Sequence, residues 1–159
     1  MANNETWAAQ SATERANVLR KAADLYEENF GLLMKLAIVE AGKHYQMQLQ
    51  SYEKRSIFSD IANQLEYLAK DQHLGPPRGK VLCISPWNFP LATFRAASLA
   101  AGNAVIAKQQ NKLLIAYAAV KLLHQAGVPK EALQLVLGAG DLGAALGTTS
   151  FDGVVYWLN

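Results

Sequence analysis

Apolar residues in the first part of the chain recur at intervals of three and four positions, which is the spacing of an amphipathic helix. Residues 13–30 show this most clearly, because their charged side chains fall on the opposite face. The apolar face consists of Ala16, Leu19, Ala22, Ala23, Tyr26 and Phe30. We predict a helix here, with Thr13 as its N-terminal cap.

Two further helices are predicted in the same part of the chain. Residues 32–43 keep the helical spacing up to Gly42, a residue type that suits the left-handed turn after a helix end. Residues 51–70 carry one apolar stripe, formed by Ile57, Ile61, Leu65 and Leu68. The N-terminal part of the chain is therefore expected to be helical.

The pattern changes at residues 71–80, where glycines and prolines interrupt any helix. Short apolar runs then predict strands at residues 80–87, 103–108, 132–138 and 153–158. Helical spacing returns between the first three runs, at residues 91–102 and 112–127. This alternation predicts a parallel sheet, and the continuously apolar strands are typical of strands covered on both faces.

The expected fold class is α/β. A helical segment, residues 1–74, precedes a partial Rossmann-like parallel sheet of βαβαβ order in residues 75–159. We expect the second part to be a partial dinucleotide-binding unit.

Composition narrows the possible partners and the compartment. The 159 residues are 51% hydrophobic and 18% charged with a formal charge of +2, as in a soluble globular domain, and no basic run favours nucleic acid. The most apolar helix contains Lys121 and His124 and is shorter than the roughly 20 residues of a membrane span. A single cysteine and an N-terminus without a secretory pattern predict a cytoplasmic protein.

Two positions that follow predicted strands are candidates for chemistry. Residues 85–90, "SPWNFP", form a stiff turn at the carboxyl end of a strand, where open α/β sheets bind ligands. Asn88 is suited to donate its amide hydrogen to an oxygen that gains negative charge, or alternatively to cap the following helix. Lys108 ends the second strand and suits a ribose or 2′-phosphate, or alternatively is a solvated strand end.

Other reactive residue types give weaker signals. Cys83 lies in an apolar strand without a basic neighbour, which favours a buried structural thiol over a nucleophile. No metal site is expected, because the three histidines, His44, His73 and His124, lack ligand spacing. We expect Glu40 and Glu131 to be surface charges.

A glycine pattern, "GAGDLG" at residues 138–143, matches the phosphate-binding G-x-G-x-x-G. It follows the third predicted strand, whereas the phosphate fingerprint follows the first strand of its unit. We therefore interpret Gly138 and Gly140 as part of a tight strand-to-helix turn, with Asp141 near the helix start.

The chain resembles the aldehyde dehydrogenase superfamily, and within it the pyrroline-5-carboxylate dehydrogenase module of bifunctional proline utilisation enzymes. The resemblance rests on "ISPWNFPL" at residues 84–91 and "AAGNAVIAK" at residues 100–108. Shorter matches, "EAGK" at residues 40–43 and "AGVP" at residues 126–129, support it.

The resemblance implies a nicotinamide cofactor, NAD or NADP, and roles for individual residues. Asn88 matches the asparagine that donates to the oxyanion formed when a catalytic cysteine attacks an aldehyde. The wall beside the cofactor is matched by Ile84, Ser85, Pro86 and Trp87. Lys108 matches the lysine that hydrogen-bonds the adenine ribose. The implied reaction is oxidation of glutamate semialdehyde to glutamate.

Two departures from the family pattern limit this implication. Asn111 stands where the family usually has a ribose-binding glutamate, so ribose binding is expected to be altered. After the fourth predicted strand, "VVYWLN" at residues 154–159 does not continue into the family's threonine, glycine and serine turn. The catalytic cysteine and glutamate lie later in the family's sequence. The chain alone is therefore expected to be inactive. Its expected small-molecule partner is an aldehyde in the full enzyme. Its expected protein partner is either the rest of the dehydrogenase or a second copy of the chain bound at the fourth strand.

The alternative hypothesis is a truncated or decayed dehydrogenase-like domain with a structural or assembly role. The choice between NAD and NADP stays open at this stage.

Overall fold

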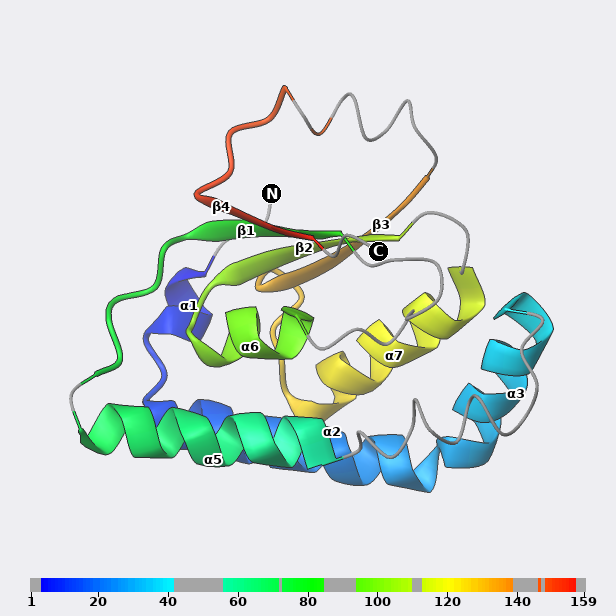
Figure 1. The fold of residues 1–159 in the computed structure, drawn as a ribbon, viewed down its shortest axis with the longest axis horizontal. Helices are drawn as coiled ribbons and strands as arrows, with labels where there is room; N and C mark the ends of the chain where they lie inside the picture. Colours follow the sequence, from blue (N-terminus) through cyan, green and yellow to red (C-terminus); the bar gives the residue numbers. More distant parts are fainter. Residues whose placement is uncertain are drawn as a thin grey trace.

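A computed structural model describes residues 4–41, 56–71, 73–84, 94–109, 113–138, 146 and 148–156. These residues build a parallel sheet with helices on one side of it, which confirms the expected α/β fold class (Figure 1). The inner helices are α6 (Phe94–Ala100) and α7 (Leu113–Ala126), and the outer pair are α2 (Ala12–Glu28) and α5 (Ser56–Lys70). The molecule therefore has three layers, namely the sheet, the inner helices and the outer helices.

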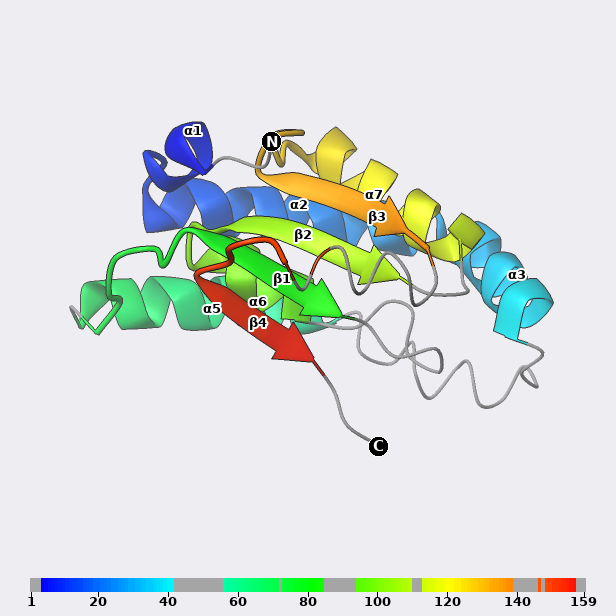
Figure 2. The same cartoon turned by 90° about the horizontal axis from the view of Figure 1, so that it is seen from above.

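The sheet contains β1 (Lys80–Ile84), β2 (Ala104–Gln109), β3 (Leu133–Leu137) and β4 (Gly153–Tyr156) in the order β3-β2-β1-β4. All three strand pairs are parallel, as predicted. Figure 2 shows the four strands pointing the same way, so their carboxyl ends lie at one edge of the sheet.

The helical segment consists of α1 (Glu5–Ala8), α2, α3 (Phe30–Ala41) and α5. The predicted cap Thr13 is wrong, because the N-cap of α2 is Ser11. Ser11 and Glu14 form a capping box in which the Ser11 Oγ accepts from the Glu14 backbone N–H and the Glu14 carboxylate accepts from Ser11. Hydrogen bonds from Ser11 lower the pKa of Glu14. The predicted helix end at Gly42 lies outside the described residues.

One hydrophobic cluster joins the helical segment to the sheet. Trp7, Tyr26 and Leu33 pack in the same cluster as Val81 and Val105 of the strands. A second cluster between α2, α5 and α6 contains Ala16, Leu19, Ala62, Leu65 and Ala100. The predicted inner face of α2 is confirmed for Ala16, Leu19, Ala22 and Tyr26, whereas Ala23 is half-buried and Phe30 starts α3, because the predicted helix is interrupted after Glu28. Leu68 of the predicted α5 stripe is 38% exposed.

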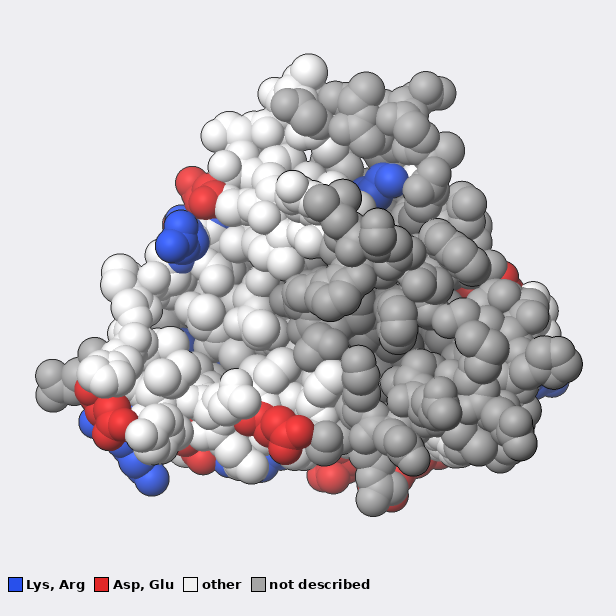
Figure 3. All heavy atoms as spheres, in the orientation of Figure 1, with Lys and Arg blue, Asp and Glu red and all other residues white. Residues whose placement is uncertain are grey.

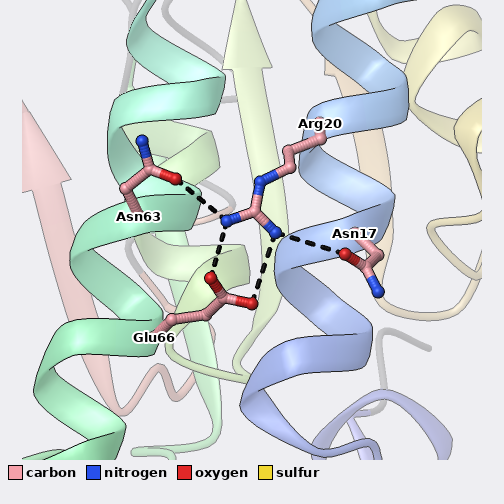
Figure 4. A network of polar contacts seen from close by, with 4 residues as sticks. All are labelled: Asn17, Arg20, Asn63 and Glu66. Carbon is pink, nitrogen blue, oxygen red and sulfur yellow. Dashed lines mark hydrogen bonds and ion pairs between the residues drawn. The ribbon is translucent and has the colours of Figure 1, made fainter.

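A polar network closes the outer side of the contact between α2 and α5 (Figure 4). Arg20 donates hydrogen bonds to the carboxylate of Glu66 and to the side-chain oxygens of Asn17 and Asn63. Its hydrogen bond lowers the pKa of Glu66. Charged side chains gather along this outer layer in Figure 3, with both signs interspersed on the part of that face that the structure describes.

The strands differ in how completely they are covered. The middle residues of β1 are buried, and so are most residues of β2, as the apolar pattern predicts. In β4 the burial alternates, and Val154 and Tyr156 are 51% and 57% exposed. The prediction of coverage on both faces fails for β4 and also for β3, whose Leu137 is 40% exposed, because both are edge strands and the described helices lie on one side of the sheet (Figure 1).

Candidate functional site

The carboxyl edge of the sheet brings together two of the predicted site residues. Ile84 ends β1 and pairs with Lys108 of β2, which in turn pairs with Val136 of β3. Paired residues of neighbouring strands point to the same face, so Ile84 and Lys108 share one face of the sheet. The other predicted site residues, Ser85, Pro86, Trp87 and Asn88, lie outside the described residues, as does Asn111.

Lys108 is only 8% exposed, so it is not the solvated strand end considered as an alternative. The strand alternation places it on the face opposite to Ala107, which packs in the main core with the helices. No hydrogen bond or ion pair joins its side chain to another described residue. Lysine is seldom buried to this extent, so this position is unusual for a purely structural residue.

Gln109, the next residue, is also a buried polar side chain, with 1% of its surface exposed. Neither its Oε1 nor its Nε2 has a hydrogen-bond partner in the described part of the chain. Sequence reasoning missed this residue. A signal was present, because a strand period of two places Gln109 on the same face as Val105 and Ala107.

At the amino edge of the sheet, the side chains of Asn103 and Asp152 have hydrogen-bond partners. The Asn103 Oδ1 accepts from the backbone N–H groups of Arg78 and Gly79 at 2.7 and 3.1 Å, and its Nδ2 donates to the Ser98 carbonyl at 3.0 Å. The Asp152 carboxylate accepts from the Lys80 backbone N–H at 2.7 Å. These bonds tie β1 to β4 and to the turn before β2.

Residues of the helical segment hold the end of α6, the helix that follows Asn88 in the sequence. The Trp7 indole donates to the Leu99 carbonyl at 2.7 Å, and the Arg15 Nε donates to the Ala100 carbonyl at 2.9 Å. The Arg15 guanidinium also donates to the Gln10 carbonyl. Burial lowers the pKa of Arg15, and a cation at a helix C-terminus is favoured by the helix dipole.

The sequence predicted that Glu40 is a surface charge, but the structure shows its carboxylate hydrogen-bonded to another helix. Its two carboxylate oxygens accept from the backbone N–H groups of Leu114 and Ile115, at 2.8 and 2.9 Å. The carboxylate near the end of α3 therefore caps the first turn of α7.

The Glu131 carboxylate accepts a hydrogen bond from the Thr6 hydroxyl at 3.0 Å. Hydrogen bonds from its own backbone and from Thr6 lower the pKa of Glu131.

The remaining candidates are resolved in part. Cys83 is confirmed as a buried thiol outside any disulfide, with its Sγ 3.7 Å from the Ser98 Oγ. The Gly138 backbone N–H donates to the Gln109 carbonyl at 3.3 Å, while Gly140 and Asp141 lie outside the described residues.

Within the described ranges no three histidine, cysteine, aspartate or glutamate residues cluster as metal ligands would. Nor does any helix of those ranges have the length and apolar character needed to cross a bilayer.

The fold and this edge define an α/β protein of the kind that binds ligands at the carboxyl ends of parallel strands. The model of the aldehyde dehydrogenase family matches residues 1–154. The chain belongs to that family.

Sequence relatives include bifunctional proteins named PutA. The PutA of Rhizobium meliloti is 42% identical over 151 residues, which cover 90% of this chain and 12% of the relative. The PutA of Escherichia coli K12 is 39% identical over 162 residues, which cover 97% of this chain and 12% of that protein. The chain therefore spans about an eighth of the length of these relatives.

Solved structures give the same picture. A crystal structure of a variant of proline utilization A from Bradyrhizobium japonicum has a TM-score of 0.75 and 36% identity, and covers 95% of this chain and 17% of that chain. An NAD-dependent benzaldehyde dehydrogenase from Corynebacterium glutamicum has a TM-score of 0.80, covering 98% of this chain and 43% of that one. At 23% identity, the second likeness shows the fold alone.

Proposed function

We propose that this chain is the N-terminal part of a nicotinamide-dependent aldehyde dehydrogenase that oxidises glutamate semialdehyde, the open form of pyrroline-5-carboxylate, to glutamate. The family membership and the PutA relatives support this proposal. In it, residues 1–74 are the helical segment and residues 75–159 a partial dinucleotide-binding unit. The proposed compartment is the cytoplasm, as expected for a chain with a single cysteine.

The observation that carries the proposal is the buried Lys108 beside Ile84 at the carboxyl edge of the sheet. Its ammonium would donate hydrogen bonds to the hydroxyls of the adenine ribose, and this contact would give the buried charge a partner. Ile84, Ser85, Pro86 and Trp87 would form the wall beside the cofactor. The residues present thus fit a nicotinamide dinucleotide, which when bound supplies a hydride acceptor.

Asn88 would stabilise the reaction by donating its side-chain N–H to the oxygen that becomes negative when a thiolate adds to the aldehyde. Cys83 does not fit the role of that thiolate, because its side chain is 0% exposed within the core. The nucleophilic cysteine and the glutamate that activates water would be contributed by other parts of the dehydrogenase. The chain by itself is therefore proposed to bind cofactor without turning over aldehyde.

Calorimetric titration of the chain with NAD, and separately with NADP, tests the proposal. Lys108→Met keeps a long apolar side chain but removes the charge, and should weaken cofactor binding by about tenfold or more. Lys80→Met is the matched control, because Lys80 starts β1 at the opposite edge of the sheet. Equal affinities of K108M and the wild type would exclude Lys108 from the binding site.

A non-catalytic domain with an assembly role is the second candidate, and the asparagine at position 111 favours it. The family holds the ribose with both a lysine and a glutamate, whereas this chain has the lysine and an asparagine in place of the glutamate. One of the two ribose contacts would therefore be lost. The absence of any heat at millimolar NAD would support this candidate, whereas an affinity in the micromolar range would count against it.

A further inference from the structure

None of the four residues of β4 is buried, and the apolar pattern of this strand does not set its register. β4 lies at an edge of the sheet beside β1 (Figure 2). Val155 packs against the main core, and Val154 is 51% exposed on the opposite face. A shift of β4 by one residue toward the carboxyl edge would put Val154 in the place of Val155, so the core would receive the same residue type. The same shift would move Tyr156 about 3.3 Å past Ile84, its partner in β1.

One residue at the amino end of β4 distinguishes the observed register from the shifted one. Asp152 precedes the strand and is bonded twice to Lys80, the first residue of β1. The Asp152 backbone N–H donates to the Lys80 carbonyl at 2.9 Å, and the Lys80 backbone N–H donates to the Asp152 carboxylate at 2.7 Å. The charged acceptor makes the second bond one of the stronger kind. A one-residue shift would place Asp152 opposite Val81 and break both bonds.

Gly79 leaves the space that this carboxylate occupies. A Cβ atom at position 79 would clash with the Asp152 Oδ2, and the φ of +121° is one that residues with a side chain rarely adopt. The backbone of Gly79 is bonded to the start of β2, because its N–H donates to the Asn103 Oδ1 at 3.1 Å and its carbonyl accepts from the Ala104 N–H at 2.9 Å. The glycine is therefore fixed on the β2 side and open to Asp152 on the β4 side.

We propose that Asp152 is a positioning residue for the carboxyl edge of the sheet: with Gly79 it sets the register of β4 on β1. The two strands are paired along all four residues of β4, so an offset at the amino end is passed on unchanged to the carboxyl end. The consequence is that Tyr156, and not Val155, lies beside Ile84. In the proposed function Ile84 lines the cofactor, but the register of β4 does not depend on whether a cofactor binds.

The test compares Asp152→Ala and Asp152→Asn with the wild-type chain by NMR, without cofactor. D152A removes the acceptor, so the backbone amide of Lys80 should exchange about tenfold faster. A second set of signals should also appear, with contacts between the side chains of Ile84 and Val155, which lie on opposite faces in the observed register. D152N keeps an acceptor oxygen and should restore most of the wild-type pattern. Asp24→Ala, which removes an exposed carboxylate of α2, is the matched control and should change neither signal.

Gly79→Ala tests the same contact from the other strand. The added methyl group would displace the carboxylate, so G79A should also produce the second set of signals. The double variant G79A/D152A should shift the register no further than G79A, because both substitutions remove one contact. Gly75→Ala is the control, since a Cβ atom there meets nothing within 4 Å. Unchanged Lys80 exchange and a single register in D152A, or an equal change in D24A, would overturn the inference.

Discussion

The two edges of the sheet handle their buried polar groups in opposite ways. At the amino edge, Asn103 is 6% exposed and its side chain makes hydrogen bonds to three backbone groups. At the carboxyl edge Lys108 and Gln109 are also buried, and neither polar atom of the Gln109 amide has a hydrogen-bond partner among the described residues. The cost of burying polar groups is offset for Asn103 but not for Gln109.

This difference separates a structural edge from a candidate binding edge. Polar groups that are already paired stabilise the sheet, and their donors and acceptors are not available for hydrogen bonds to a ligand. Buried groups without partners reduce stability, and a ligand that pairs with them regains that free energy. Mutations of the paired groups at the amino edge should therefore lower stability, whereas removal of an unpartnered group at the carboxyl edge should not.

The largest effect is expected for Asn103→Ala. The substitution leaves the N–H groups of Arg78 and Gly79 without their acceptor, and the Ser98 carbonyl keeps only its bond from the backbone N–H of residue 103. Unfolding should therefore become easier by about 2–3 kcal/mol. Urea denaturation followed by circular dichroism measures this change. Gln64→Ala, at an exposed position of α5, is the control and should change stability by less than about 0.5 kcal/mol.

An effect of opposite sign is expected at the carboxyl edge for Gln109→Leu. The substitution replaces an unpaired buried amide with an apolar side chain and should stabilise the chain by about 1 kcal/mol in the same urea experiment. A loss of stability in Q109L would mean that the amide has a partner, and the contrast between the two edges would then disappear.

The smallest effect on unfolding is expected for Tyr156→Lys at the carboxyl end of β4. Tyr156 and Val154 are exposed on an edge strand, and we predict that the chain self-associates through this edge. Y156K should leave stability within about 0.5 kcal/mol and shift the chain toward monomer in sedimentation velocity at increasing concentration. Tyr67→Lys, an exposed tyrosine of α5, is the control. A wild-type chain that stays monomeric at high concentration would refute the prediction.

Local patterns predicted much of the fold because the forces behind them act over a few residues. The spacing of Leu19 and Tyr26 identified the buried face of α2, and the apolar runs located the four strands. The cap of α2 was misplaced at Thr13 although the Ser11 and Glu14 pair was visible in the sequence. Gln109 was likewise visible as an inward strand position, and it was missed because only Lys108 resembled a ligand-binding residue.

Other features depend on residues far apart in sequence, and no local pattern reveals them. The bond from Glu40 to α7 and the bond from Arg15 to the end of α6 both join distant segments, so they exist only once the helices have packed. The same holds for the pairing of Asn103 with the turn before β1.

The sequence by itself determined the fold class, the identity of the family and the position of Lys108 one residue before the end of a strand, because periodicity and short motifs encode these directly. Tertiary structure alone decided that Lys108 is buried beside Ile84, that β4 is an edge strand and that Glu40 caps α7. The physical reason is that burial and hydrogen-bond partners are properties of the packed chain, in which the sheet order and the helix layers place distant residues side by side.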